Sequence, residues 1–160
     1  MHPLGRVPCL VHDDLILYES GAICQYLCEV FDKKEQLGRG IAHKEHAEWI
    51  QWLHYAETIA VHGASLVQQN IIIAEEFRSP LVIKLESRRL EKTLEVLDNH
   101  LKGRDYLLKS GFSAVDTSVG YSIHMGSMFV KISEFKNVEN YYHKLKNRDA
   151  FKKSLPKDIN

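Results

Sequence analysis

The fold is set by two stretches near the start of the chain: PLGRVPCL at residues 3–10 and ESGAI at residues 19–23. Around them, residues 7–12 and 15–18 are short runs of β-forming side chains separated by two aspartates. Turn-forming residues between two such runs predict a β-hairpin. The spacing of apolar residues over positions 20–31 then predicts an amphipathic helix directly after the hairpin.

The rest of the chain is predicted to be helical and joined to this first part by a linker. Residues 32–40 are charged and contain two glycines, which is typical of a connecting segment. Pro80 after Ser79 fits the first position of a helix. Apolar periodicity predicts helices at residues 43–70, 80–101, 113–128 and 134–146, and a terminal turn at 150–155.

The charge balance argues against two classes of partner. The 160 residues carry 21 basic and 21 acidic side chains, so the formal net charge is zero. This balance gives no electrostatic basis for binding nucleic acid or an acidic membrane surface. No apolar run is long enough to span a bilayer, and the first residues lack the regions of a signal peptide. We therefore expect a cytoplasmic protein with no nucleic-acid and no membrane partner.

The cysteines offer little support for a metal site. An odd and low count of three argues against a disulfide framework. Cys24 and Cys28 lie four positions apart and would share a helix face, where two small buried residues are the simpler interpretation. A metal or redox pair is the alternative, but no second ligand pair at a suitable spacing accompanies it. We therefore predict no metal.

The Val7-Pro8 dipeptide stands at the start of a predicted strand, where proline is unusual because it donates no ladder hydrogen bond. A cis bond between these residues would bend the chain and expose the N–H and C=O of Val7. Exposed backbone groups of this kind can pair with a peptide-like ligand as an added strand does. An ordinary edge proline is the alternative interpretation.

The Glu19-Ser20 dipeptide lies where the predicted helix begins. The Ser20 hydroxyl and the free N–H groups of the first turn could hold a carboxylate. Glu19 beside it could hold an ammonium group, so the pair suits the head of an α-amino acid. Taken alone, a plain N-cap serine next to a solvated glutamate explains the pair as well.

Together, in this order and at this separation, the two stretches resemble the glutathione transferase family over residues 3–27. In that family they form the third strand, fourth strand and third helix of a thioredoxin-like domain. The resemblance implies that the backbone of Val7, before Pro8, pairs with the cysteinyl unit of glutathione. It also implies that Glu19 and Ser20 hold the γ-glutamyl end. Glutathione would be a co-substrate, with no further cofactor.

The fold class implied by the resemblance is mainly α. Residues 1–32 would form a truncated thioredoxin-like β-hairpin plus helix, and residues 41–160 an all-α C-terminal helical bundle. The run FSAVD at residues 112–116 resembles the family's capping motif, in which Ser113 caps the Asp116 amide and Asp116 reaches back to the Ser113 amide. This motif serves folding and not catalysis.

The run WLHYAE at residues 52–57 is similar to the long helix that lines the cleft for the electrophilic substrate and the dimer interface in the family. The resemblance thus implies a homodimer and a small electrophilic molecule as second substrate. Trp49, Trp52 and Tyr55 are large enough to line that cleft. Core packing of one or two of them is the simpler alternative.

The chain departs from the family at its start. The family's domain opens with a strand, a helix and a second strand, whereas this sequence begins almost at the Val-Pro turn. The missing first strand would carry the tyrosine, serine or cysteine that holds the glutathione sulfur as thiolate. We find no replacement in residues 1–6 and expect no catalytic role for Cys9 or Ser20, so the catalytic residue is unknown. The strand at 7–12 should then have an open edge, free or paired with another copy.

Three hypotheses follow. The first is a glutathione transferase that conjugates glutathione to electrophiles, impaired without its first strand. The second is a non-catalytic dimerisation or protein-interaction module, as the same fold provides in translation elongation complexes. The third is that Met1 is an internal methionine of a longer protein.

Overall fold

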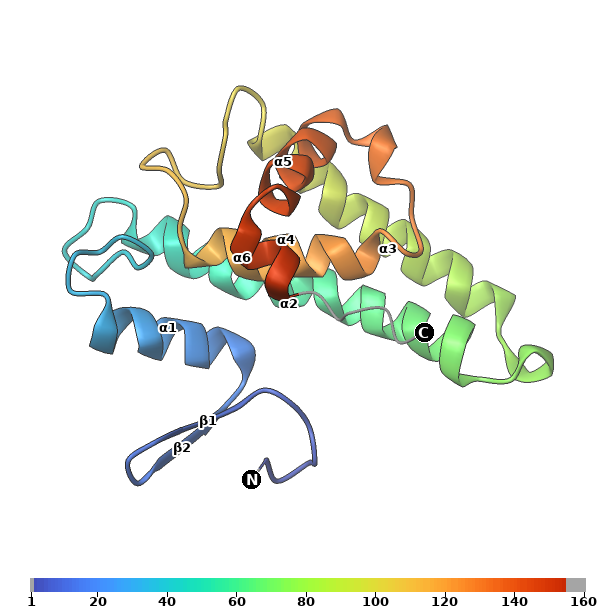
Figure 1. Cartoon of the computed structure of the whole chain (residues 1–160). Coiled ribbons are helices and arrows are strands. Elements are labelled where there is room, and N and C mark those ends of the chain that lie inside the picture. Colours follow the sequence, from blue (N-terminus) through green and yellow to red (C-terminus); the bar gives the residue numbers. More distant parts are fainter. Residues whose placement is uncertain (1, 155–160) are drawn as a thin grey trace.

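The computed structural model of the chain describes residues 2–154, in which a small hairpin and a helix precede a helical bundle (Figure 1). Short π and 3₁₀ turns occur at Gln68–Ile72, Glu75–Phe77 and Ile132–Glu134. The strands and α-helices are β1 Cys9–His12, β2 Leu15–Tyr18, α1 Ser20–Phe31, α2 His46–Val67, α3 Pro80–His100, α4 Ala114–Gly126, α5 Lys136–Lys146 and α6 Asp149–Ser154.

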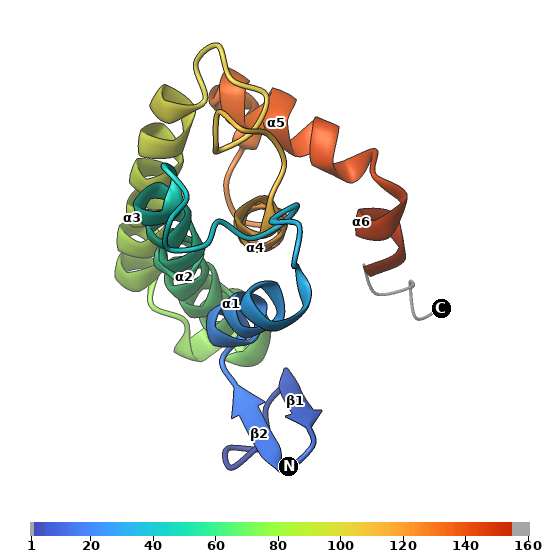
Figure 2. The ribbon, with the colours of Figure 1, turned by 90° about the vertical axis from the view of Figure 1, so that its left-hand side faces the viewer.

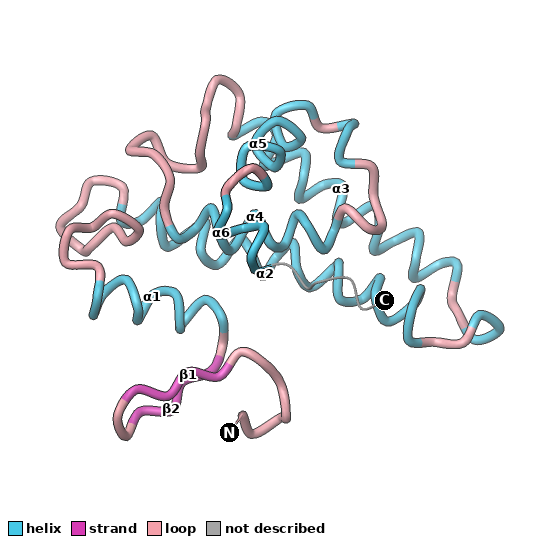
Figure 3. The backbone as a smooth tube through the Cα atoms, in the orientation of Figure 1, coloured by secondary structure: helices cyan, strands magenta, loops and turns pink. Residues whose placement is uncertain are grey.

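The predicted hairpin is confirmed, although its first strand is shorter than expected. β1 and β2 pair antiparallel in a register that runs from Cys9 opposite Tyr18 to His12 opposite Leu15. The Val7–Pro8 peptide is cis, which is one of the two interpretations that the sequence left open. Pairing starts at Cys9 and not at Val7, which follows from the missing N–H of Pro8. These two strands form the one sheet of the described residues (Figure 3).

The predicted helices are all present, with small differences at their ends. α1 has the predicted bounds. α2 was predicted over residues 43–70 but begins at His46, and a π turn continues it beyond Val67. Ser79 caps α3 by accepting a hydrogen bond from the Val82 amide at 3.3 Å. The terminal helix ends at Ser154, so the predicted last residue, 155, lies outside the described part.

The core of the molecule lies within the helical bundle, where α2 packs against both α3 and α4 (Figure 2). α1 lies between this bundle and the hairpin in both views. Burial of large aliphatic side chains is the main stabilising contribution, about 1.5–3 kcal/mol for each. Fully buried side chains include Leu53, Ile59, Leu66, Leu94, Leu97 and Ile123. This confirms the fold class, a mainly α chain with a thioredoxin-like hairpin and helix followed by a helical bundle.

The Ser113–Asp116 pair forms a capping box at the start of α4. The Ser113 amide donates to Oδ2 of Asp116 at 2.7 Å. Oδ1 of the same carboxylate accepts from the Leu107 amide at 3.1 Å. The cap thus fixes both the helix start and the loop that precedes it.

The linker between the two parts is held firmly against the bundle. Asp32 accepts hydrogen bonds from three backbone amides that follow it, at 2.6 to 2.9 Å. Nε of Arg39 donates to Oγ of Ser110 at 2.9 Å, and Oε1 of Glu45 accepts from the Ser110 amide at 3.3 Å. These contacts hold the linker and the residue before α2 against the loop that precedes α4. In the described residues, no helix combines the length and the apolar character needed to cross a bilayer.

Candidate functional site

The register of the hairpin brings the two motifs of the sequence to one end of the sheet. Because Cys9 pairs with Tyr18, the next residue outward on each strand is Pro8 on one side and Glu19 on the other. Neighbouring strands lie about 4.8 Å apart, so the chain segments at Val7 and at Ser20 leave the sheet side by side. All four predicted glutathione-binding residues are exposed there.

Val7 presents an open stretch of backbone. Its residue surface is 92% exposed, and it lies outside the paired segment of β1. Within residues 2–154, neither its N–H nor its C=O makes a hydrogen bond. A preceding turn at Gly5, with a φ of 62°, closes with a bond from its amide to the His2 carbonyl at 3.0 Å. The backbone of Val7 is therefore available to an extended ligand.

Ser20 is the first residue of α1 and not its N-cap. The N-cap position is occupied by Glu19, whose φ of 76° and ψ of 114° lie outside the helical region and whose side chain makes no capping hydrogen bond. The plain N-cap explanation of Ser20 therefore does not hold. Its hydroxyl donates instead to Oε1 of Glu57 on α2, at 3.3 Å. The first amides of α1 are left without a side-chain acceptor, which suits an anionic group at this helix end.

Two contacts hold this end of the molecule in place. Nδ1 of His12 and the hydroxyl of Tyr26 share a hydrogen bond of 2.7 Å, which ties the hairpin to α1. On the same helix, Ile23 is buried and Cys24 lies against α4, where its sulfur is 3.8 Å from the Ser118 hydroxyl. The two cysteines of α1 are thus packed against the bundle.

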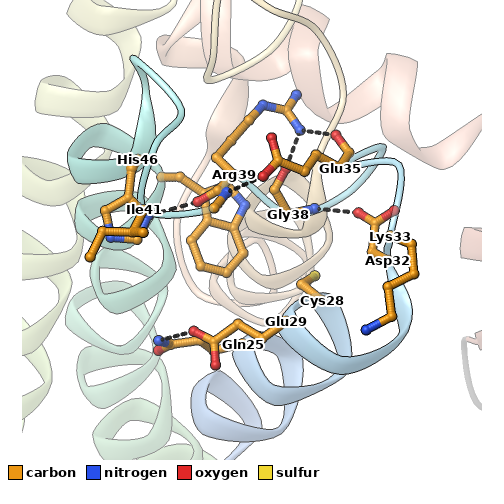
Figure 4. Close-up of a pocket in the computed structure, with 12 residues that line it drawn as sticks. Gln25, Cys28, Glu29, Asp32, Lys33, Glu35, Gly38, Arg39, Ile41 and His46 are labelled. Atoms are coloured by element: carbon orange, nitrogen blue, oxygen red, sulfur yellow. Dashed lines mark hydrogen bonds between the residues drawn. The ribbon is translucent and has the colours of Figure 1, made fainter.

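A separate cavity of about 550 Å³ lies between α1, the linker and the start of α2 (Figure 4). Burial, followed by the nearby Asp32 carboxylate, raises the pKa of the Cys28 thiol in its wall to about 11. A thiol with so high a pKa is protonated at neutral pH and is a poor nucleophile. None of the predicted glutathione-binding residues lines this cavity, although Trp49 does. The described residues contain no cluster suited to holding a metal ion.

The three aromatic residues predicted for the electrophile cleft are engaged in packing. Trp49 and Trp52 are each only 2% exposed. Nε1 of Trp49 donates to the Leu37 carbonyl at 3.0 Å. Trp52 packs edge-on against Tyr55 with ring centroids 5.1 Å apart, and the Tyr55 hydroxyl donates to the Thr93 carbonyl at 3.0 Å. Their role in binding a second substrate stays a prediction.

Glu57 was not predicted from the sequence. It lies within the WLHYAE run, but nothing in a single sequence links position 57 to position 20. The link arises because α1 runs antiparallel to α2, with its end near the start of α2 and its beginning near the middle of α2.

Comparison with known proteins identifies relatives of this chain in two groups, glutathione S-transferases and elongation factors 1-gamma. The family "Glutathione S-transferase, N-terminal domain" matches residues 1–29. Glutathione S-transferase F13 of Arabidopsis thaliana is 31% identical over 170 residues, which cover 98% of this chain and 74% of that protein. Elongation factor 1-gamma 3 of Oryza sativa is 28% identical over 97% of this chain but only 38% of its own length. Glutathione S-transferase 1 of Schizosaccharomyces pombe is 29% identical, covering 74% of this chain and 52% of that protein.

Solved structures show the same fold at lower identity. A glutathione transferase of Phanerochaete chrysosporium with oxidized glutathione matches 95% of this chain and 71% of its own, with a TM-score of 0.85 and 19% identity. A glutathione transferase of Burkholderia graminis with two bound glutathione molecules matches with a TM-score of 0.83 and 24% identity, over 95% and 67% of the two chains. The chain spans about two fifths to one half of the first curated relatives, and about three quarters of the Arabidopsis protein. Because it is 31% identical to the Arabidopsis protein over 98% of its own residues, this chain belongs to the glutathione S-transferase family.

Proposed function

We propose that the chain binds glutathione at the end of the hairpin where Val7 and Pro8 lie beside Glu19 and Ser20. The observation that carries this proposal is the β1–β2 register, because it brings an unpaired backbone segment next to the free N-terminus of α1. The N–H and C=O of Val7 pair with the cysteinyl unit as an added strand would. The first amides of α1 and the Ser20 hydroxyl hold the γ-glutamyl carboxylate, and Glu19 holds the ammonium group.

The activity that we propose is conjugation of glutathione to a small electrophilic molecule, at a low rate. Conjugation requires a group that stabilises the thiolate form of the bound cysteine. The four proposed glutathione-binding residues, Val7, Pro8, Glu19 and Ser20, supply backbone groups, one hydroxyl and one carboxylate. All of these groups bind the peptide backbone or the γ-glutamyl end of glutathione and not its sulfur. Cys28, in the separate cavity, has a raised pKa and supplies no such group. These residues by themselves therefore bind the tripeptide better than they activate its sulfur.

The proposal also covers the roles of the two parts of the chain and its association into a dimer. The first part, residues 1–32, acts as the glutathione-binding half, and residues 41–160 act as the helical domain of a cytoplasmic homodimer. Exposed apolar side chains on the hairpin and in the first turns of α3 support an interface between copies, since exposed apolar surface is commonly covered at such interfaces. They include Val11, Ile16, Leu81 and Leu85.

A second candidate is a non-catalytic interaction module. It is favoured by the match to elongation factor 1-gamma 3 over 97% of this chain. Such a module has no need of the Glu19–Ser20 pair, so association with a partner should survive the loss of both side chains. The two candidates therefore differ in whether binding requires the side chains of Glu19 and Ser20.

The test is titration calorimetry with S-methylglutathione, which contains the tripeptide without a reactive thiol. We expect measurable binding by the natural chain and at least tenfold weaker binding by the Glu19→Ala, Ser20→Ala double variant, because charge-assisted hydrogen bonds contribute about 1.5–3 kcal/mol. The matched control is Ser133→Ala, Glu134→Ala, which removes an exposed serine–glutamate pair from the far 3₁₀ turn. Absence of binding by the natural chain would favour the interaction module.

A further inference from the structure

The hairpin is attached to α1 at both of its ends. At one end a single residue, Glu19, joins the last residue of β2 to the first residue of α1. At the other end Nδ1 of His12 and the Tyr26 hydroxyl share a hydrogen bond of 2.7 Å. Within the part of the chain that the structure describes, this is the one hydrogen bond of residues 9–18 that reaches beyond the hairpin.

The two attachment points lie at matching distances along the hairpin and along α1. From Tyr18 back to Leu15, the partner of His12, β2 extends about 10 Å at about 3.3 Å per residue. From Ser20 to Tyr26, α1 rises about 9 Å at about 1.5 Å per residue. α1 therefore runs back along the hairpin, and the turn end of the sheet meets the middle of the helix (Figures 1 and 3).

Tyr26 projects from the side of α1 that faces away from the bundle. Cys24 and Cys28 pack against the bundle core, and at about 100° per residue each lies about 200° around the helix from Tyr26. Beside Tyr26, the His12 ring also contacts Phe31, with ring centroids 5.2 Å apart. His12 thus contributes both a hydrogen bond and ring contacts to the attachment of the hairpin.

We infer that His12 and Tyr26 are positioning residues of the glutathione site, because their contact sets the angle between the hairpin and α1. This inference rests on the proposed function, in which the Val7 backbone and the first amides of α1 bind different parts of one peptide. His12 lies at the turn end of the hairpin, and Val7 lies beyond its other end. A two-stranded hairpin is only marginally stable by itself. Without the contact it pivots about Glu19, and Val7 moves relative to the start of α1.

Loss of the contact therefore lowers the affinity without removing any group from the site. When only a fraction of the molecules has the binding-competent arrangement, the apparent dissociation constant rises by the inverse of that fraction. Tyr26→Phe keeps the aromatic ring and removes the hydroxyl. We expect it to weaken S-methylglutathione binding about fivefold, equivalent to about 1 kcal/mol, the usual contribution of one hydrogen bond.

Calorimetric titration with S-methylglutathione compares the natural chain with Tyr26→Phe and a set of related variants. His12→Leu removes the hydrogen-bond partner, whereas His12→Asn keeps a polar group near the position of Nδ1 and should bind more tightly than His12→Leu. The double variant should bind no more weakly than His12→Leu alone, since both changes break the same bond. Tyr142→Phe is the matched control, because its hydroxyl shares a 2.6 Å hydrogen bond with Nδ1 of His124 in the bundle. It should bind as the natural chain does.

Hydrogen exchange of residues 9–18, measured without ligand, reports the attachment of the hairpin directly. We expect faster exchange of these backbone amides in Tyr26→Phe and no change in Tyr142→Phe, because a detached hairpin opens its ladder of hydrogen bonds more often. Thermal melting confirms that each variant is folded.

An unchanged affinity in Tyr26→Phe, or an equal loss in Tyr142→Phe, would overturn the inference and leave the proposed function standing. Faster exchange without a loss of affinity, or a loss of affinity without faster exchange, would overturn it as well. If the natural chain does not bind S-methylglutathione, the proposed function fails, and the positioning role fails with it.

Discussion

The hydroxyl of Tyr141 on α5 donates to Oδ1 of Asp116 on α4 at 2.9 Å, and both side chains are buried. The same carboxylate accepts from the amides of Ser113 and Leu107. One acidic side chain therefore joins a helix start, the loop before it and a neighbouring helix. Burial raises the pKa of Asp116, although these hydrogen bonds oppose the shift.

Replacing Asp116 by alanine should therefore destabilise the bundle severely. The change leaves two backbone amides and the Tyr141 hydroxyl without acceptors in the interior. Each unsatisfied buried donor costs about 1–3 kcal/mol, so we expect a loss of about 3 kcal/mol or more in the free energy of unfolding. Urea denaturation followed by circular dichroism measures it. Asp14→Ala, at the exposed hairpin turn, should change the midpoint little, and an equally small change for Asp116→Ala would contradict the assignment.

Two glycines of similar burial should respond in opposite ways to alanine. At Gly120 an added Cβ would lie 2.5 Å from Cδ1 of the buried Leu145, whereas at Gly63 no atom lies within 4 Å of it. We expect Gly120→Ala to cost about 1–3 kcal/mol through overpacking. Gly63→Ala should stabilise the chain by about 0.5–1 kcal/mol, because alanine favours the helix. The same urea experiment compares the two variants, and equal effects at both sites would contradict the close packing of Leu145 against Gly120.

The two tryptophans provide a similar contrast in hydrogen bonding. Nε1 of Trp49 donates to the Leu37 carbonyl, whereas the buried Nε1 of Trp52 has no partner among the described residues. Both Trp→Phe changes remove similar buried volume, but only Trp49→Phe also breaks a hydrogen bond between α2 and the linker. We expect it to be more destabilising by about 1 kcal/mol. Chemical denaturation of both variants measures the difference, and a larger loss for Trp52→Phe would be the opposite of this expectation.

Acid should weaken the contact between α2 and α3 through Glu86. Its carboxylate accepts from Nδ1 of His62 at 2.8 Å and pairs with Arg89. The His62 hydrogen bond, opposed by burial and aided by Arg89, holds the pKa of Glu86 below its ordinary value of 4.5. A carboxyl with a lowered folded-state pKa contributes stability above its unfolded pKa and loses it as the pH falls through the folded value.

Glu86→Gln should therefore flatten the acid side of the stability profile, from pH 4.5 downward. Denaturation midpoints measured across that range, with Glu95→Gln as an exposed control on the same helix, provide the comparison. An unchanged acid slope in Glu86→Gln would show that this carboxyl makes no pH-dependent contribution.

Local patterns were sufficient to predict the elements and the motifs. The hairpin, the bounds of α1 and the Ser113–Asp116 cap involve residues close together in the chain, where turn chemistry, side-chain period and capping preference act directly. The start of the first strand was one exception, because β1 begins at Cys9, one residue after Pro8, and not at Val7. The capping residue of α1 was another, since Glu19 takes the position expected of Ser20.

Contacts between distant elements could not be predicted in this way. The sequence by itself determined that a carboxylate and a hydroxyl stand at the start of α1, because propensity and periodicity act on neighbouring residues. Only the tertiary structure decided that Glu57 meets Ser20 and that Tyr141 meets Asp116, since both depend on how whole helices pack. That packing is set by the summed burial of many apolar side chains, each contributing a little, and no short motif encodes it.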